Sequence, residues 1–425
     1  MSYMTGAKAV GNFLTARLKY NLDEADVFEP AYKETQWLSM MLKMAKLPVN
    51  ASTFKSFSNT PSWIDRQFYI RQAAGDTWAS SAVGAALTGT TITVSTAGTG
   101  TAASVGFLVP GLIVRIKTAG GDTHALVTAV TSQTNITLVS LTATPQSITD
   151  ADKVQVVGVA MGETSSATTA VNSILTANTH YCQDFENAWS MSNQAEAEVI
   201  FGPDEWTRLA AETLRTHKTD INRGLLLGIG NDATAITLAT ESVSVRTTDG
   251  FITFCEANSS TLMNGAGVVT PSYSSYTYNN FVDDMESLFA LGSAAKVGIA
   301  GSSVLSFFSK IGSGSFLAGA NVNIQNAETS FGLNITKVMT PFGTLALIWD
   351  KVLRGDGFFK DYMAVADLEY AKYRPLSGNG QAFDTHLLTN TQNPNQFRIR
   401  RYAYRTVAGS QYNTPSVHGL FRFTA

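Results

Sequence analysis

The sequence has few cysteines and no long hydrophobic run. Cys182 and Cys255 are the only cysteines in 425 residues, so no disulfide framework can form. The two thiols could pair with each other, but we expect reduced, buried thiols of a cytosolic product. No apolar run reaches the ~18 residues that a membrane-spanning helix needs, and we expect no membrane anchor. The first residues lack a basic stretch followed by an apolar core, so we expect no secretory signal.

Charge is also scarce. Charged residues make up 15% of the chain, against about 25% in an ordinary soluble domain. The 30 Lys and Arg against 33 Asp and Glu give a net charge of −3, which argues against nucleic-acid binding through overall positive charge. Hydrophobic residues reach 44%, enough for substantial cores. We therefore expect folded domains whose surface is partly covered by other chains.

The residues that usually carry catalysis or metal binding do not form a recognisable pattern. The histidines are scattered, no zinc motif includes them, and His217 is expected on a helix surface. The glycine-rich run Gly98–Ala103 is not followed by a helix start, so it does not match a dinucleotide-binding loop. We expect no catalytic residue, no metal site and no cofactor.

Two helices are expected near the N-terminus. Val10, Phe13, Leu14 and Leu18 recur at helical spacing. A second helix is expected over 31–46, with Trp37, Leu38, Met41 and Ala45 on one side and Pro48 after its end. Two short amphipathic helices before any obvious core indicate an arm that packs on another chain, or helices that cover their own domain.

Composition changes near residue 80. From Gly84 to Thr149 the only formal charges are Arg115, Lys117 and Asp122. Short alternating segments are separated by turn residues, which is typical of a small independent β-domain. We expect strands at 91–95, 112–117, 125–130, 135–139 and 154–159. Because the segment carries so little charge, we expect it to contact neighbours.

The clearest long helix is expected from Pro203 to about Leu227. Proline at the first helical position and two following acids suit a helix start, and Gly228 suits its end. An α/β mixture follows, with a helix around Phe281–Phe289, a buried strand at Lys296–Ala300, a helix over 303–311 and a hairpin at 333–349. The last fifty or so residues read as mostly β.

The densest basic patch lies on a strand expected over Phe397–Arg405. Aromatic residues interleaved with arginine can stack on single-stranded nucleic acid. They are equally favoured where subunits meet, which is the reading we prefer. The candidate inter-subunit contacts on this strand are Arg398, Arg400, Arg401, Tyr402 and Arg405.

Several motifs, in this order, resemble a known family. The run His180–Phe185 followed by Trp189–Ala195 is similar to the Asn-Tyr-x-Gln-x-Phe…Val-Ser-x-Thr-x-x-Ala run of the HK97-like major capsid proteins of tailed bacteriophages. The segment Glu205–Gly228 is similar to the long spine helix of that family. Looser matches are Met161–Glu163, Thr248–Phe251 and Val417–Gly419. From about Ser58 on, the chain looks like the subset with a small β-domain inserted near the N-terminus.

The resemblance implies an α+β, HK97-like capsid fold with an inserted all-β domain. Its expected parts are an N-terminal arm at 1–79, the inserted β-domain at 80–165, an extended loop at 166–202, a peripheral domain with the spine helix at 203–249, an axial domain at 250–375, and return strands of the peripheral domain at 376–425. The extended loop would reach over a neighbour, which makes Phe185 and Trp189 further candidate inter-subunit contacts.

The function that the resemblance implies is that of a major capsid protein, not an enzyme. Such a protein assembles with itself, as hexamers and pentamers, into the icosahedral head shell around the double-stranded DNA of a tailed phage. Scaffold, portal and decoration proteins would be partners, and packaged DNA would be bound only weakly at the inner face. The protein would be found in the virion, and in the host cytoplasm during assembly.

Three alternatives remain at this point. One is the shell protein of an encapsulin-like compartment with the same fold. Another is a phage enzyme or adhesin whose β-domain binds carbohydrate, but Phe107 is the only aromatic residue between Gly84 and Thr149. The third is a nucleic-acid-binding protein, for which salt-dependent binding of DNA by the monomer would be the test.

Overall fold

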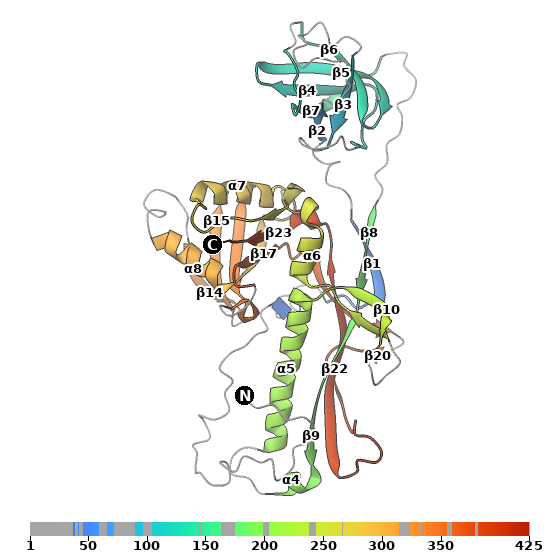
Figure 1. Ribbon diagram of the computed structural model, residues 1–425, viewed down its shortest axis with the longest axis vertical. Coiled ribbons are helices and arrows are strands. Elements are labelled where there is room, and N and C mark those ends of the chain that lie inside the picture. The colour runs from blue at the N-terminus through green and yellow to red at the C-terminus, as the bar shows by residue number, and fades with distance from the viewer. Residues whose placement is uncertain are drawn as a thin grey trace. The chain divides into compact units, whose positions relative to one another are not determined.

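The computed structural model divides the chain into two compact units. One contains Met1–Ser58 and Ala177–Ala425, and the other contains Asn59–Thr176. The residues that the structure describes are 37–38, 41, 46–58, 66–71, 90–96, 104–143, 146–162, 175–198, 204–237, 244–265, 267–313, 324–330, 333–354, 359–378 and 381–424. Strands and helices occur together in the larger unit and strands in the smaller one (Figure 1), which confirms the α+β class.

The smaller unit is a closed barrel. Its strands are β2 (Gln67–Arg71), β3 (Thr90–Ser95), β4 (Leu112–Thr118), β5 (Gly121–Ser132), β6 (Asn135–Ser140) and β7 (Lys153–Val159), paired in the order β2-β3-β6-β5-β4-β7. All five strands that the alternation predicts are present. Alternate residues point inward and form a core of their own, which includes Phe68, Ile70, Val114, Val127 and Leu138.

The barrel begins earlier in the chain than the expected boundary at residue 80. Strand β2 pairs with β3 and with β7, so it closes the barrel. Its sequence, Gln-Phe-Tyr-Ile-Arg, offers only Phe68 and Ile70 to the core, and its ends are polar. Such a short alternation is weak on its own, and its partners are distant in sequence, which is why the pattern did not place it in the domain.

The larger unit contains a mixed sheet covered by helices. In the described part of the chain the strand order is β12-β23-β17-β13-β16-β15-β14. The strands are β12 (Val268–Val269), β13 (Ala295–Ala300), β14 (Ile324–Ser330), β15 (Leu333–Thr340), β16 (Gly343–Trp349), β17 (Tyr362–Ala366) and β23 (Gly419–Arg422). The helices α6 (Phe251–Ala257), α7 (Tyr278–Phe289) and α8 (Ser302–Ser313) and the short η3 (Ser259–Thr261), η4 (Met263–Gly265), η5 (Lys351–Leu353) and η6 (Pro415–Val417) complete it. The expected helices at 281–289 and 303–311, the strand at 296–300 and the hairpin at 333–349 are confirmed.

A second sheet of the larger unit is built on the long strand β22 (Ile399–Tyr412). It pairs with β9 (Gln183–Ser192) on one side and with β18 (Ala371–Pro375) and β21 (His386–Leu388) on the other. Short two-stranded pairs are β1 (Thr53–Ser58) with β8 (Thr176–Tyr181), β10 (Asn231–Thr237) with β11 (Ser244–Thr247), and β19 (Ser377–Gly378) with β20 (Gln381–Ala382). The part of 166–202 that the structure describes, residues 175–198, is therefore mainly paired strand.

The long helix α5 (Glu205–Leu227) begins and ends where the sequence indicates. The Asp204 carboxylate accepts hydrogen bonds from the Thr207 backbone N–H (2.9 Å) and hydroxyl (2.7 Å), and these bonds lower the pKa of Asp204. The helix stops at Gly228, whose N–H is bonded to the Gly224 carbonyl. With 23 residues, α5 is about 34 Å long.

Of the N-terminal helices, only one turn lies in the described residues. Trp37, Leu38 and Met41 are helical and belong to the core of the larger unit. These three residues therefore cover their own domain, which was one of the two readings of the sequence. The helix expected around Val10–Leu18 lies outside the described residues.

Candidate assembly interface

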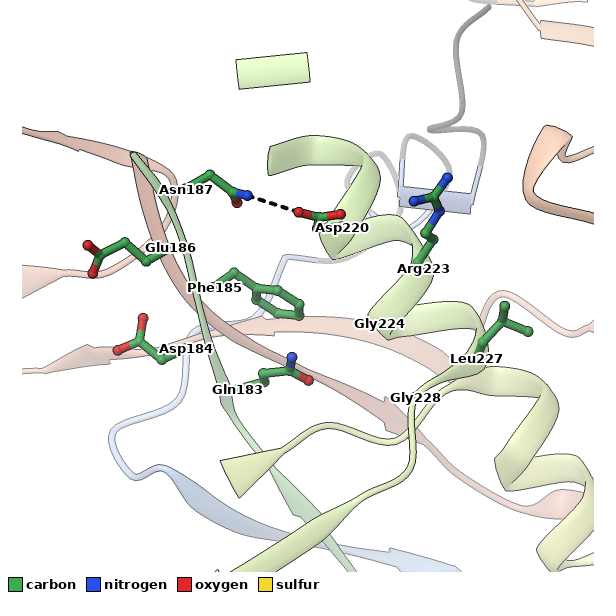
Figure 2. Close-up of a pocket in the computed structure, with 10 residues that line it drawn as sticks. All are labelled: Gln183, Asp184, Phe185, Glu186, Asn187, Asp220, Arg223, Gly224, Leu227 and Gly228. Atoms are coloured by element: carbon green, nitrogen blue, oxygen red, sulfur yellow. Dashed lines mark hydrogen bonds between the residues drawn. The ribbon is translucent and has the colours of Figure 1, made fainter. Parts of the chain in front are cut away.

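Strands β9 and β22 form a long antiparallel ribbon. The pairing runs from Ser192 opposite Ile399 to Gln183 opposite Ala408. Helix α5 packs along this ribbon (Figure 1). Because side chains alternate along a strand, Phe185 and Asn187 face α5, while Asp184 and Glu186 face away from it (Figure 2). Trp189, two residues further along, also faces α5 and contacts Trp206.

An aromatic cluster joins the ribbon to the first turn of α5. Trp189 stacks on Tyr404 at 4.9 Å between ring centroids and lies 5.6 Å from Trp206. Tyr402 meets Trp206 edge-on at 5.1 Å. The Arg400 guanidinium lies over Trp206 (4.4 Å) and Tyr402 (4.8 Å) and forms a salt bridge with Glu196. Contacts of this kind give favourable aromatic and cation–π energy within the subunit.

His217 joins three elements in the middle of the ribbon. Its Nδ1 lies 2.7 Å from Asn187 Oδ1, and its Nε2 lies 2.8 Å from Thr406 Oγ1. The Asn187 amide N–H donates to Asp220, so its oxygen is the acceptor for Nδ1–H of His217. The side chain is fully buried, and this burial lowers its pKa. The expectation that His217 lies on a helix surface is wrong, because α5 is packed against the sheet at this position.

The opposite face of the ribbon carries a second ion pair. Arg405 Nε donates to both carboxylate oxygens of Asp184 at 3.0 Å, and the guanidinium also lies 5.9 Å from the Phe383 ring. Both side chains are partly exposed, so the pair is worth only about 0–1 kcal/mol. It fixes the direction of Arg405 more than it stabilises the fold.

A shallow groove of about 500 Å³ separates β9 from the second half of α5 (Figure 2). The Phe185 ring projects across it, and a Cβ atom at Gly224 would lie 2.9 Å from that ring. Glycine at this position therefore lets Phe185 pack closely on the helix. Asp220 and Arg223 are the charged side chains of α5 that line the groove.

The sequence-predicted contact residues fall into three groups. Phe185 and Trp189 are 7% and 6% exposed and pack inside the subunit, so the isolated subunit presents little of either side chain to a neighbour. Arg400, Tyr402 and Arg405 are half-buried and interact within the chain. Arg398 is exposed, and Arg401 is half-buried; within the part of the chain that the structure describes, neither forms a salt bridge.

Sequence reasoning missed Phe397 and Trp206. Phe397 is 73% exposed at the end of the ribbon, beside the Arg398 guanidinium at 5.7 Å. A large exposed aromatic residue next to Arg398 resembles the residues found at protein interfaces. Trp206 was expected on the helix, but its partners Trp189 and Tyr402 could not be read from sequence spacing.

No group of three or more possible metal ligands occurs among the residues that the structure describes. Within the same residues, no helix is long and apolar enough to cross a membrane. Cys182 and Cys255 are free and buried, and burial raises the pKa of Cys182 to about 11 and that of Cys255 further.

Comparison with known proteins identifies the family. The model of the SU10 major capsid protein family matches residues 27–401. The chain therefore belongs to the SU10 major capsid protein family, and the resemblance to phage major capsid proteins is confirmed. As a major capsid protein it is a subunit of a phage head shell and associates with copies of itself in the virion.

The solved structures that resemble this one are only about 10% identical to it in sequence. The capsid of a native GTA particle is 10% identical with a TM-score of 0.48, and 97% of each chain is covered. Microbacterium phage Oxtober96 gives 9% identity and a TM-score of 0.43 over 96% of this chain and 97% of that one. The SrpI encapsulin complex of Synechococcus elongatus PCC 7942 gives 9% identity and a TM-score of 0.37 over 59% of this chain and 77% of that one. No curated protein has a significantly similar sequence.

Proposed function

We propose that this chain builds a closed icosahedral shell, from rings of five and six copies, around the double-stranded DNA of a tailed phage. The family match over residues 27–401 is the observation that carries the proposal. A closed shell needs the same surface patches to meet repeatedly. Assembly would take place in the host cytoplasm, with scaffold and portal proteins as further partners.

The end of the ribbon is the proposed contact between subunits. Arg400 and Arg405 are engaged within the chain, so they fix the strand that presents the remaining groups. Phe397, Arg398 and Arg401 supply an exposed aromatic ring and two cations without salt bridges among the described residues. We assign them to an acidic surface of a neighbouring copy, because the net charge of −3 makes acids the more abundant partners.

We also propose that the protein has no catalytic role. The two fully buried histidines have structural partners: His217 bonds Asn187 and Thr406, and His418 bonds the Asp367 N–H and the Asn413 carbonyl. The groove beside α5 contains no nucleophile with an adjacent base. Contact with packaged DNA would be weak, since a slightly acidic protein releases few counterions from DNA.

Electron microscopy of the purified chain, alone and with its scaffold, tests the proposal. We expect closed particles or rings, and particles recovered from infected cells should contain DNA. A chain that stays monomeric across salt and protein concentration would contradict the proposal. Particles that contain a packaged protein in place of DNA would favour the encapsulin-like alternative.

A further inference from the structure

The two most exposed large hydrophobic side chains among the described residues lie at opposite ends of helix α5. Phe397 is 73% exposed and Ile229 is 68% exposed. Phe397 precedes the start of β22, at the end of the ribbon where Tyr402 meets Trp206 in the first turn of α5. Ile229 follows the last turn, since the helix ends at Leu227. The layer formed by α5 and the ribbon therefore has one exposed apolar side chain at each end.

These two side chains cannot touch within one subunit. Helix α5 has 23 residues and is about 34 Å long (Figure 1). The ribbon runs beside the whole helix, because the Tyr412 hydroxyl at its far end donates to the Leu225 carbonyl at 2.9 Å. Phe397 and Ile229 are therefore separated by roughly the length of α5, and each leaves its apolar surface to another chain.

The Ile229 end continues into the groove between β9 and α5. Gly228 lines that groove and directly precedes Ile229. Leu227 is half-buried and also lines the groove, and the Phe185 ring projects across it (Figure 2). Ile229 therefore belongs to a larger apolar surface and is not an isolated side chain.

The ribbon end, which consists of Phe397, Arg398 and Arg401, is basic. Arg398 is exposed, and its guanidinium lies 5.7 Å from the centroid of the Phe397 ring. Arg401 is half-buried on the same part of the ribbon. A neighbour that covers the Phe397 ring therefore also meets a guanidinium, and an anion is the partner that this group favours.

The groove has the opposite charge. Three carboxylates and one guanidinium line it, those of Asp184, Glu186, Asp220 and Arg223. Asp184 pairs with Arg405, and Asp220 accepts from Asn187. Glu186 is exposed on the face of β9 that is directed away from α5, and it forms no salt bridge among the residues described (Figure 2). We call Glu186, Leu227, Gly228 and Ile229 the groove end.

We propose that the ribbon end of one copy docks on the groove end of the next copy, with Phe397 against Ile229 and Arg398 beside Glu186. This contact covers an exposed apolar side chain on each copy and joins a cation to an anion. Pairing two ribbon ends would bring Arg398 and Arg401 of both copies together, and pairing two groove ends would bring their carboxylates together. Contact between unlike ends avoids both kinds of repulsion.

Unlike ends generate rings instead of pairs. A head-to-tail contact closes into a ring when the rotation between neighbours closes. Rings of five and six copies are part of the proposed shell function, and this inference rests on that proposed function. It identifies the groove end as the acidic surface to which we assign the ribbon end.

Cysteine cross-linking in assembled particles of the full-length protein tests the contact. We expect the double variant Phe397→Cys with Ile229→Cys to form disulfides between subunits when the particles are oxidised. Within one subunit these positions are roughly 34 Å apart, whereas the Cα atoms of a disulfide lie within about 7 Å of each other. Because each copy has one new cysteine at each end, the bonds run from copy to copy around a ring. A non-reducing gel should show a ladder of bands at multiples of the subunit mass.

The controls use the same positions one at a time. Each single cysteine variant should stay at the subunit mass, because the two new cysteines meet only at unlike ends. Native Cys182 and Cys255 are 3% and 0% exposed, so they provide little background. Phe57 is also exposed, at 61%, and the pair Phe57→Cys with Ile229→Cys tests whether Phe57 occupies the groove end instead. That pair should give no ladder.

Charge reversal gives a second measurement. Glu186→Arg should lower the yield of particles several-fold, because it places a cation opposite Arg398 of the neighbour. Adding Arg398→Glu to this variant restores one cation and one anion at the contact, so most of the yield should return. Circular dichroism of unassembled subunits should be the same in both variants, which separates assembly from folding.

Normal particles without a ladder, or a loss at Glu186→Arg that Arg398→Glu does not rescue, would overturn this contact and leave the shell function intact. A single band of twice the subunit mass would indicate a two-fold contact and would also overturn it, as would a ladder from the Phe57 pair. If the cysteine variant itself does not assemble, the charge reversal and its rescue decide. If the unmodified chain forms neither particles nor rings, the shell function itself fails.

Discussion

A buried ionic cluster holds the centre of the mixed sheet. Lys296 is 1% exposed; its Nζ donates to the carbonyls of Val417 (2.5 Å) and Leu291 (2.9 Å) and lies 3.6 Å from Asp367 Oδ2. The same Asp367 oxygen accepts from the Ser293 N–H at 2.7 Å. Each charge is therefore compensated by hydrogen bonds as well as by its partner, which is what a buried pair requires.

Removing one partner of this pair should be costly. We expect Lys296→Met to lower the free energy of unfolding by about 3–5 kcal/mol, because the Asp367 carboxylate is left buried without a cation. The double variant with Asp367→Asn should recover part of the loss, since the asparagine oxygen still accepts from backbone N–H groups. Urea unfolding of unassembled subunits measures both. Equal losses in the single and double variants would show that the ionic interaction contributes nothing.

His418 makes stability depend on pH. Burial, and then the nearby Lys296 charge, lower its pKa to about 3, while Asp367 opposes the shift. The folded state therefore keeps His418 neutral, whereas the unfolded chain binds a proton near pH 6.5. Its stabilising contribution is complete above pH 6.5 and is lost as the pH falls toward 3.

The slope of stability against pH tests this effect. Below about pH 6, protonation of His418 in the unfolded chain should lower the free energy of unfolding of wild type by about 1.4 kcal/mol for each pH unit. His418→Gln retains an acceptor and a donor but does not titrate, so its stability should fall less between pH 7 and pH 5. The pKa of His217 is also lowered, so wild type and His418→Gln should both still lose some stability as the pH falls. The exposed His124→Gln is the matched control, and identical slopes in all three proteins would contradict the role of His418.

At the scale of elements, the N-terminal turn is locked into the larger unit. Trp37 is fully buried and stacks on Phe251 of α6 at 5.1 Å between ring centroids. Its backbone N–H donates to Asp350, and its indole N–H donates to the Leu225 carbonyl at 3.3 Å. Asn222 accepts from the Leu38 N–H at 2.7 Å. The turn thereby ties α5 to the end of the mixed sheet.

Trp37→Ala should release this turn. We expect a loss of about 3–5 kcal/mol in the free energy of unfolding, because a large buried ring is removed. Trp37→Phe keeps a ring against Phe251 and loses only the indole hydrogen bond, so about 1 kcal/mol is expected. Trp349 is 43% exposed, and Trp349→Ala serves as the matched control with a much smaller effect. If Trp37→Ala and Trp349→Ala lower the free energy of unfolding equally, the N-terminal turn is not part of the core.

Elements with strong local patterns could be predicted from the sequence. Helix α5 has a capping aspartate, a long apolar spacing and a terminal glycine, and the strands of the barrel alternate clearly. Strand β2 and the burial of His217 could not be predicted, because both depend on partners far away in the sequence. The burial of Phe185 and Trp189 could not be predicted either, because it depends on α5 packing against β9.

At the scale of the whole molecule, the charges that remain outside intramolecular pairs decide how copies can meet. Arg398 is exposed beside Phe397, and Arg401 extends from the same end of the ribbon. Each unit has a hydrophobic core of its own, one in the barrel and another in the larger unit. Substitutions at the ribbon end should therefore affect assembly without affecting folding.

The double variant Arg398→Glu with Arg401→Glu tests this separation. We expect circular dichroism and the thermal unfolding of unassembled subunits to be unchanged, because neither side chain has a salt bridge in the described residues. Assembly should be lost, since glutamates would repel the acidic surface that we assign to the neighbour. The lysine double variant keeps both positive charges and should still form particles in electron microscopy and sedimentation. Normal particles from the glutamate variant would exclude the ribbon end as a contact, and a folding defect shared with the lysine variant would show that these arginines act within the subunit.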